Sequence, residues 1–195
     1  MATCRAIGKT TLAGLRTPLI AREAGLSTAA IHYHFATKKK LLQALSSWLM
    51  DGFRELRILP SERRVELLPN SAPKDQLDAL IRYQTLLARP ENSTMIRVFY
   101  DLWVQAANGS DVHAAEMRAH YSTYREQVRS ALGLDDHWAD HAAQRTLVGV
   151  VLSLLEGGVQ QLLIQPDAFD CDEYFGVVRR IAEQEGATSC GRWTL

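Results

Sequence analysis

The sequence predicts an all-α protein with a small N-terminal domain, residues 1–55, and a larger C-terminal domain, residues 56–195. Apolar residues recur at intervals of three and four along almost the whole chain, and no run alternates strictly between apolar and polar residues as a half-buried strand does. Residues that start and stop helices separate these apolar segments. A chain of 195 residues can hold one sizeable core, or a small domain attached to a larger one.

The composition is that of a soluble globular protein, with 47% apolar and 23% charged residues. The three cysteines (Cys4, Cys171 and Cys190) are odd in number and scattered, which favours a reducing compartment. The first twenty residues contain basic side chains and no apolar core run, so they do not have the pattern of a signal peptide. We therefore expect a cytoplasmic protein.

The N-terminal domain is predicted to begin with three short helices. Thr17 and Pro18 are typical of a helix start, with Thr17 as the N-cap and Pro18 at the first helical position. This helix stops at Gly25, and Ser27 caps a second short helix. The third helix begins near Thr37.

The C-terminal domain is predicted to consist of longer helices after a loose, proline-containing connection at residues 57–74. Its last helix opens with Asp170 and Glu173, a capping-box arrangement, and ends at Gly186. The preceding helices are predicted over residues 75–88, 93–108, 111–132 and 135–164, the third closed by Gly133 and the fourth broken by Pro166.

The charge is divided unevenly, although the chain is neutral as a whole. Residues 1–40 hold seven Lys and Arg against one acidic residue, which gives +6, so the other 155 residues sum to −6. A basic head on an acidic body suggests that the head meets a polyanion. A basic surface that is merely solvated would give the same charges.

Two helices joined by a short glycine-containing turn form a helix-turn-helix. Ile31 and Phe35 are four residues apart and can pack on Ile20, Ala21 and Ala24 of the first helix. The opposite face carries small side chains, which let a helix backbone enter the DNA major groove. This face holds Thr28, Ala29, Ala30 and Tyr33, with His34 one turn on.

Lys38, Lys39 and Lys40 stand in the first turn of the third helix. Cations are unfavourable at that end of a helix, by a few tenths of a kcal/mol to about 1 kcal/mol each. A bound phosphate would remove the conflict, because ammonium groups and free amides then converge on one anion.

The stretch "RTPLIAREAGLSTAAIHYHFATKKKLLQAL" resembles the DNA-binding domain of TetR-family transcriptional regulators. His32 departs from the family pattern, which more often has an aromatic residue there. The resemblance implies phosphate contacts from Thr17, Tyr33, His34 and Lys38, and a groove face of Thr28, Ala29, Ala30 and Tyr33. Together with the cap Ser27, these are the predicted DNA-binding residues. The first helix is predicted to be short or incomplete, because "MATCRAIGKTTLAGL" offers less length than the family's first helix.

The segment "LLEGGVQQLLIQPDAFDCDEYFGVVRRI" is similar to the last two helices of the betaine-regulator-like branch of this family. Residues 146–164 are apolar nearly all round, and Glu156, Gln160 and Gln161 argue against a membrane span. We therefore expect this helix to be buried on both sides, with one side against a second copy of the chain. The predicted dimer interface is Val151, Leu155, Gly158, Leu162, Tyr174 and Val178.

A ligand pocket is predicted on two consecutive helices, where aromatic and soft side chains could line a cavity. The alternative is that these side chains are ordinary core. Arg97 or Glu156 could provide a charged anchor. The predicted pocket residues are Phe99, Tyr100, Trp103, Met117, Tyr121 and Tyr124.

Neither a metal, nor a cofactor, nor an enzyme activity is predicted. The pairs His137 with His141 and His113 with His120 have helical spacing but no further ligand at suitable spacing. The predicted function is a ligand-responsive, homodimeric regulator that binds a palindromic operator in double-stranded DNA, with repression as the family's usual mode. The alternative is a dimeric small-molecule-binding protein with a non-functional DNA-binding head.

Overall fold

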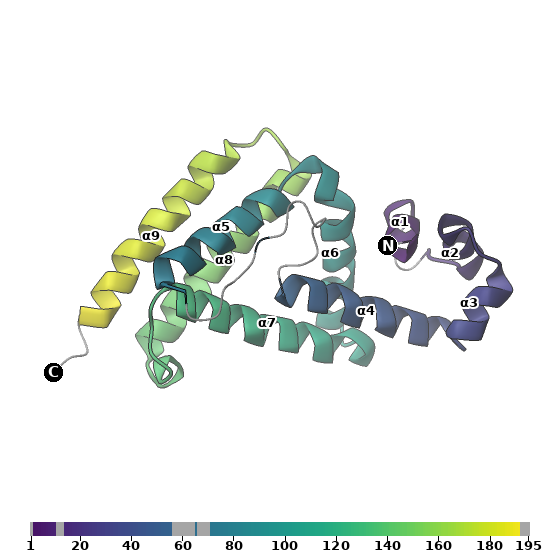
Figure 1. Ribbon diagram of the computed structural model, residues 1–195, viewed down its shortest axis with the longest axis horizontal. Helices are drawn as coiled ribbons and strands as arrows, with labels where there is room; N and C mark the ends of the chain where they lie inside the picture. The colour runs from purple at the N-terminus through teal and green to yellow at the C-terminus, as the bar shows by residue number, and fades with distance from the viewer. Residues whose placement is uncertain (1, 11–13, 56–64, 66–70, 192–195) are drawn as a thin grey trace. The chain divides into compact units, whose positions relative to one another are not determined.

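The computed structural model describes residues 2–10, 14–55, 65 and 71–191, and all regular elements in these ranges are helices (Figure 1). The predicted all-α class is confirmed. The elements are α1 (Ala2–Gly8), α2 (Thr17–Ala24), α3 (Thr28–His34), α4 (Lys38–Arg54), α5 (Pro73–Leu87), the 3-10 turn η2 (Pro90–Asn92), α6 (Ser93–Ala107), α7 (Asp111–Ala131), the 3-10 turn η3 (Trp138–Asp140), α8 (Ala142–Ile164) and α9 (Cys171–Gly191).

The chain divides into two compact units, each assembled from two separate segments. Unit 1 comprises residues 1–53 and 91–120, and unit 2 comprises residues 54–90 and 121–195. The predicted boundary after residue 55 falls near the end of the first segment of unit 1. However, α6 and the first half of α7 also belong to this unit, so it is larger than the predicted head. Most of the predicted loose connection, residues 57–74, lies outside the described residues.

In unit 1, the short helix α1 packs against α2 and α6. Cys4, Ala6 and Ile7 form its buried side. Glu23 of α2 joins the two helices, because its carboxylate accepts from Lys9 Nζ at 2.7 Å and its backbone carbonyl accepts from Arg5 Nη2 at 2.8 Å. Lys9 and Arg5 also lower the pKa of Glu23, the Lys9 hydrogen bond being the largest cause. The predicted short first helix is therefore present and fixed to α2.

The other part of the unit 1 core lies between α4, α6 and α7. Phe99 of α6 makes edge-to-face contacts with Phe53 of α4 at 4.9 Å and with His120 of α7 at 5.4 Å. Ser47 of α4 donates a hydrogen bond to Glu116 of α7 at 2.8 Å. These contacts join α4 to α6 and α7 in one packed core.

In unit 2, α8 packs against α5 and α9. By length and composition alone α8 could cross a membrane, but core helices of soluble proteins have the same character. Here Val148, Val151 and Leu155 have no accessible surface. Because one side of α8 is covered by neighbouring helices of the same chain, we interpret α8 as a core helix.

Helix α8 packs tightly against Tyr174 of α9 at Gly158. A Cβ atom at this position would overlap Cε1 of Tyr174 and lie 2.9 Å from its Cδ1. The Tyr174 ring is fixed, because its hydroxyl donates to the Leu154 carbonyl at 2.8 Å and the ring stacks on Phe169 at 4.7 Å. A glycine is therefore required at position 158 for this packing.

Three predicted helix boundaries are wrong. The helix predicted to begin at Asp135 begins at Ala142, because Asp135 Oδ1 accepts from the His137 amide and His141 is extended. The last helix does not end at Gly186 but continues to Gly191. Gly186 lies inside the helix, where it is buried against Leu132. The N-cap of α2 is Arg16 rather than Thr17, and it makes no side-chain cap hydrogen bond.

Candidate functional site

The turn between α2 and α3 has the backbone geometry that a helix-turn-helix needs. Gly25 adopts a left-handed conformation with φ 67°, which an L side chain rarely tolerates. Its amide and that of Leu26 bond back to α2, the latter to Ala21 O at 2.9 Å. Ser27 then caps α3, accepting from the Ala30 amide at 3.1 Å. The very short turn is thus fixed by backbone hydrogen bonds at the end of α2 and by the Ser27 side chain at the start of α3.

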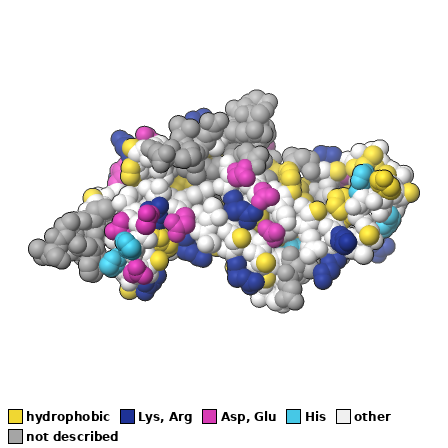
Figure 2. All heavy atoms as spheres, turned by 60° about the horizontal axis from the view of Figure 1, so that its bottom comes forward, with side chains coloured by type: hydrophobic (Ala, Val, Ile, Leu, Met, Phe, Trp, Pro, Cys, Tyr) yellow, Lys and Arg dark blue, Asp and Glu magenta, His cyan; other side chains and the backbone are white. Residues whose placement is uncertain are grey.

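The inner side of α3 is buried and its outer side is open. Ile31 is buried and packs on the α2 side, where Ile20 and Ala21 are also buried, as predicted. Tyr33 is 86% exposed, the largest value for any large apolar side chain among the described residues, and its ring meets that of His34 edge to face at 5.2 Å. Figure 2 shows histidine and Lys or Arg side chains at the surface of the part of unit 1 that holds α2 and α3.

The three lysines lie where α4 begins. Thr37 caps this helix by accepting from the Lys40 amide at 3.2 Å, so the lysines occupy its first turn. All three side chains are exposed. Within the described ranges none of them forms an ion pair with an acidic residue. Free backbone amides and unpaired ammonium groups at one helix terminus form a site for an anion.

The predicted DNA-binding residues lie together on α2, α3 and the start of α4. Five are exposed and three are half-buried, so none is part of the core. The exposed ones are Ser27, Ala29, Tyr33, His34 and Lys38, and the half-buried ones are Thr17, Thr28 and Ala30. The small outer face of α3 therefore has exposed flanking groups that can contact a phosphate backbone, which is the arrangement of a DNA-reading helix.

Replacing Ser27 with alanine is expected to reduce the stability of unit 1 by about 1 kcal/mol and to weaken DNA binding. The loss of the cap leaves the Ala30 amide without its partner and lets the first turn of α3 fray. Thermal unfolding followed by circular dichroism measures the first effect, and fluorescence anisotropy the second. Ser27→Thr keeps a capping oxygen and is the matched control. Unchanged stability in Ser27→Ala would show that the cap contributes nothing.

This geometry is that of a helix-turn-helix, the class of motif that reads DNA. Residues 2–45 match the sequence profile of the family described as bacterial regulatory proteins, tetR family. The N-terminal part of the chain is thus similar to the DNA-binding domain of this family, as the resemblance of its sequence predicts. No curated protein sequence matches the chain.

Several solved structures share the fold over nearly the whole chain. A transcriptional regulator from Rhodococcus sp. Rha1 is 19% identical, with 96% of this chain and 91% of that chain covered and a TM-score of 0.67. A TetR regulator from Haloarcula marismortui is 20% identical, with 96% and 93% covered and a TM-score of 0.65. A protein from Saccharomonospora viridis, assigned as a transcriptional regulator and in complex with choline, is 21% identical, with 93% and 92% covered and a TM-score of 0.63. At these identities the likeness concerns the fold.

The six predicted pocket residues fall into both units. Phe99 and Met117 are buried in unit 1, where Tyr100 is half-buried and Trp103 is 40% exposed. Tyr121 and Tyr124 belong to unit 2 and lie in one polar cluster. Of the two candidate anchors, Arg97 is exposed on α6, whereas Glu156 is half-buried on α8 within the same cluster as the two tyrosines.

The cluster combines α5, α7 and α8. The Tyr121 hydroxyl donates to Glu156 Oε2 at 3.0 Å, and Gln84 Nε2 donates to the hydroxyl of Tyr124. Burial raises the pKa of Glu156 to about 7, although the Tyr121 hydrogen bond acts in the opposite direction. Burial and the Glu156 charge raise the pKa of Tyr124. We refer to Tyr83, Gln84, Tyr121, Tyr124 and Glu156 as the tyrosine–glutamate cluster.

Sequence reasoning missed Tyr83 and Gln84, which lie on α5, 37 or more residues before Tyr121 in the chain. Both are buried, and the Tyr83 hydroxyl has no hydrogen-bond partner among the described residues. A glutamine at a core-facing position of an amphipathic helix is the signal that could have drawn attention to this segment. Its partner across the core cannot be read from the sequence.

Replacing Glu156 with glutamine is expected to stabilise the protein at about pH 8 by up to roughly 3 kcal/mol, and hardly at all at about pH 5. The folded state holds the Glu156 proton up to about pH 7, whereas the unfolded state releases it near 4.5. Wild-type stability therefore falls as pH rises between these values, and the variant lacks this loss. Urea unfolding at both pH values measures the difference. Equal stabilisation at both would contradict the assigned titration.

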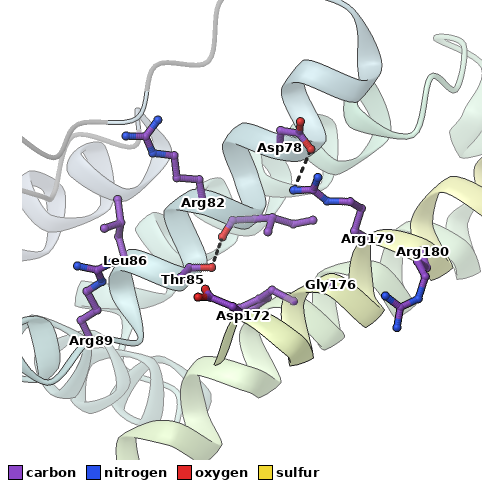
Figure 3. Close-up of a pocket in the computed structure, with 11 residues that line it drawn as sticks. Asp78, Arg82, Thr85, Leu86, Arg89, Asp172, Gly176, Arg179 and Arg180 are labelled. Carbon is purple, nitrogen blue, oxygen red and sulfur yellow. Dashed lines mark hydrogen bonds and ion pairs between the residues drawn. The ribbon is translucent and has the colours of Figure 1, made fainter. Parts of the chain in front are cut away.

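A separate groove of about 580 Å³ lies between α5 and α9 in unit 2 (Figure 3). Arg179 reaches across to Asp78 and pairs with it at 3.0 Å. Arg82 and Arg180 point away from the groove (Figure 3). The lining includes none of the predicted pocket residues. Because Arg179 is neutralised by Asp78 and both Arg82 and Arg180 face outward, we regard the tyrosine–glutamate cluster as the better candidate effector site.

The residues of the predicted dimer interface lie mostly inside the chain. Tyr174 alone is half-buried, whereas Val151, Leu155, Gly158, Leu162 and Val178 are buried. They pack within the helices of their own subunit, as the contact of Gly158 with Tyr174 shows. The outer side of α8 carries other residues, namely Gly149, Val150, Ser153, Gly157 and Gln160, which are half-buried or exposed. In the parts of the chain that are described, no group of three or more His, Cys, Asp or Glu side chains could hold a metal ion.

Proposed function

We propose that the protein is a ligand-responsive transcriptional repressor that acts in the cytoplasm as a homodimer on a palindromic operator. The observation that carries this proposal is the exposed face of α3, with unpaired lysines at the adjoining start of α4. Each subunit would place α3 in a major groove, with Lys38 to Lys40 on the neighbouring phosphates. A two-fold axis would then set two half-sites roughly 34 Å apart, one turn of the double helix.

We further propose that the two subunits meet on the outer side of α8 and on α9. The small residues Gly149, Ser153 and Gly157 recur every four positions on this side and would permit close packing of two α8 helices. Val150 and Val177 are 46% and 41% exposed and would add apolar contact area. This location replaces the buried positions that the sequence pattern favours.

Control by an effector would follow from unequal binding to two conformations of the dimer. The effector would enter unit 2 at the tyrosine–glutamate cluster and favour a conformation whose two α3 helices no longer match the operator spacing. The fold relative from Saccharomonospora viridis is in complex with choline, which supports a small-molecule site in this fold. The chain's fold relatives are transcriptional regulators, so an enzyme activity is not proposed.

The alternative function, a small-molecule-binding protein with a non-functional DNA-binding head, rests on the shortness of α1, which has 7 residues. The ion pair of Lys9 with Glu23 weakens this alternative, because it fixes α1 to α2 despite the shortness of α1. An unused head would also have no need for three unpaired lysines at a helix N-terminus.

The test is fluorescence-anisotropy titration of the protein with DNA that flanks its own gene, and with scrambled DNA of the same composition, at two salt concentrations. Tight, sequence-selective and salt-sensitive binding is expected. Absence of binding at low salt by a folded dimer would overturn the proposal and favour the alternative. Binding without sequence preference would leave a DNA-binding protein but not an operator-specific repressor.

A further inference from the structure

We propose that Glu156 is the anchor for the positively charged group of an organic cation, so that the effector is a protonated amine or a quaternary ammonium compound. This inference rests on the proposed effector site and specifies the chemistry that the site selects. It follows from four observations: the place of the carboxylate, its missing counter-ion, the tyrosines around it and the access to it.

Glu156 lies in the middle of the most apolar helix of the chain, where a charged side chain is costly without a function or a partner. The Tyr121 hydroxyl, which is a neutral donor, donates a hydrogen bond to Glu156 Oε2. One such bond does not compensate an ionised carboxylate for leaving water. The position therefore requires either protonation or a cation.

The described residues provide no cation for this carboxylate. Across the described part of the chain, no Lys, Arg or His side chain forms an ion pair with Glu156, and no charged neighbour perturbs it. By contrast, Glu23 pairs with Lys9 and Asp78 pairs with Arg179. A cationic ligand would supply the absent partner, whereas an anionic ligand would be repelled by the carboxylate.

Tyrosines form the rest of the cluster. Tyr83 and Tyr124 are buried, and the charge of Glu156 acts on Tyr124, which places the two groups near each other. The negative face of an aromatic ring attracts a cation within about 6 Å of its centre, and cages of this kind recognise ammonium groups. The phenol oxygens can also accept hydrogen bonds from a protonated amine.

Glu156 and Tyr121 both retain accessible surface, so the pair is in contact with solvent. The buried Tyr83 hydroxyl, which has no partner within the described residues, lies on the α5 side of the same cluster. The lining of the groove between α5 and α9 contains neither Glu156 nor Tyr121. A charge preference that is lost in Glu156→Gln would therefore report on Glu156 rather than on this groove.

Binding is also expected to depend on pH. The titratable side chains of the cluster around Glu156 are Tyr121 and Tyr124 on α7 and Tyr83 on α5, whereas Tyr174 of α9 contacts α8 at Leu154 and Gly158. Burial raises the pKa of Tyr83, Tyr124 and Tyr174 further above neutrality. Glu156, with a pKa of about 7, is thus the group that changes charge near neutral pH. A cation prefers the ionised form, so its affinity should increase about tenfold between about pH 6 and about pH 8, with release of a proton.

The experiment is isothermal titration calorimetry of the full chain with 2-phenylethylammonium and with 2-phenylethanol, which share a body and differ in charge, and with tetramethylammonium as a minimal cation. At about pH 8 the ammonium compound is expected to bind at least tenfold more tightly than the alcohol. Glu156→Gln should remove this preference, and Tyr121→Phe should reduce it. Glu183→Gln, an exposed α9 residue with the same change in charge, should keep it.

Equal affinity for the ammonium compound and the alcohol would overturn the inference, and so would a charge preference that survives in Glu156→Gln. Binding of neither cation to the wild-type protein would overturn it as well. The proposed function is tested separately, by operator anisotropy without any cation. Operator binding without a cation site, or a cation site without operator binding, would then identify which of the two proposals fails.

Discussion

Replacing Lys38, Lys39 and Lys40 together with glutamine is expected to weaken DNA binding by roughly one to three orders of magnitude at about 0.1 M salt, while making the fold more stable. Each lost phosphate contact removes about 0.9 from the slope of the logarithm of affinity against the logarithm of salt concentration. The same change removes three cations from the first turn of α4, where each is unfavourable by a few tenths of a kcal/mol to about 1 kcal/mol. A side chain that served the fold would show the opposite change in stability.

Anisotropy titrations over a series of salt concentrations, together with thermal unfolding, measure both effects. Specific and scrambled DNA should lose affinity by a similar factor, because phosphate contacts carry no sequence information. The matched control is Lys74, Arg82 and Arg89 all changed to glutamine, which removes three positive charges from unit 2. If this control weakens DNA binding as strongly, overall charge rather than the lysines of α4 determines the affinity.

The adjacent glycines Gly157 and Gly158 are expected to respond to alanine with opposite signs. Gly158→Ala should destabilise the protein by about 1–3 kcal/mol, because the added methyl overlaps the Tyr174 ring. The ring cannot move away without breaking its hydrogen bond to Leu154. Gly157→Ala meets nothing within 4 Å in the chain and should stabilise α8 by up to about 1 kcal/mol.

Urea unfolding of both variants measures these changes, and each variant is the control for the other, since both remove one glycine from the same turn. A stabilised Gly158→Ala would show that α8 and α9 are not packed as described. Sedimentation of Gly157→Ala adds a test of the proposed dimer face. A weaker dimer with an intact subunit fold would place Gly157 against the partner, whereas an unchanged dimer would exclude close packing there.

The sequence allowed most of the fold to be predicted, because local signals determine it. Gly25 and Ser27 specify the turn of the DNA-binding head by backbone conformation and capping, which neighbouring residues alone decide. The end of α7 at Gly133 is equally local, with φ 69°. Gly186 has the same residue type but the opposite role, because a buried contact with Leu132 replaces a helix end. Only the tertiary structure distinguishes these two glycines.

The candidate effector and dimer sites could be predicted only in part, for a related reason. Residues 146–164 are apolar nearly all round, so periodicity does not indicate which side of α8 faces the core and which is open. The pattern favoured Val151 and Leu155 as interface residues, and both are buried within the subunit. The hydrogen bond of Tyr121 to Glu156 joins residues 35 positions apart, and packing rather than spacing brings them together.

Glu156, Gly157 and Gly158 are consecutive in α8, yet they face three different parts of the structure. Successive residues of an α-helix are rotated by about 100°, so these three point respectively toward the tyrosine–glutamate cluster, the outer surface and α9. One turn of α8 therefore connects these three surfaces rigidly. If a ligand at Glu156 turns or shifts α8, the surface at Gly157 moves with it directly, and no relay of side chains between the two sites is needed.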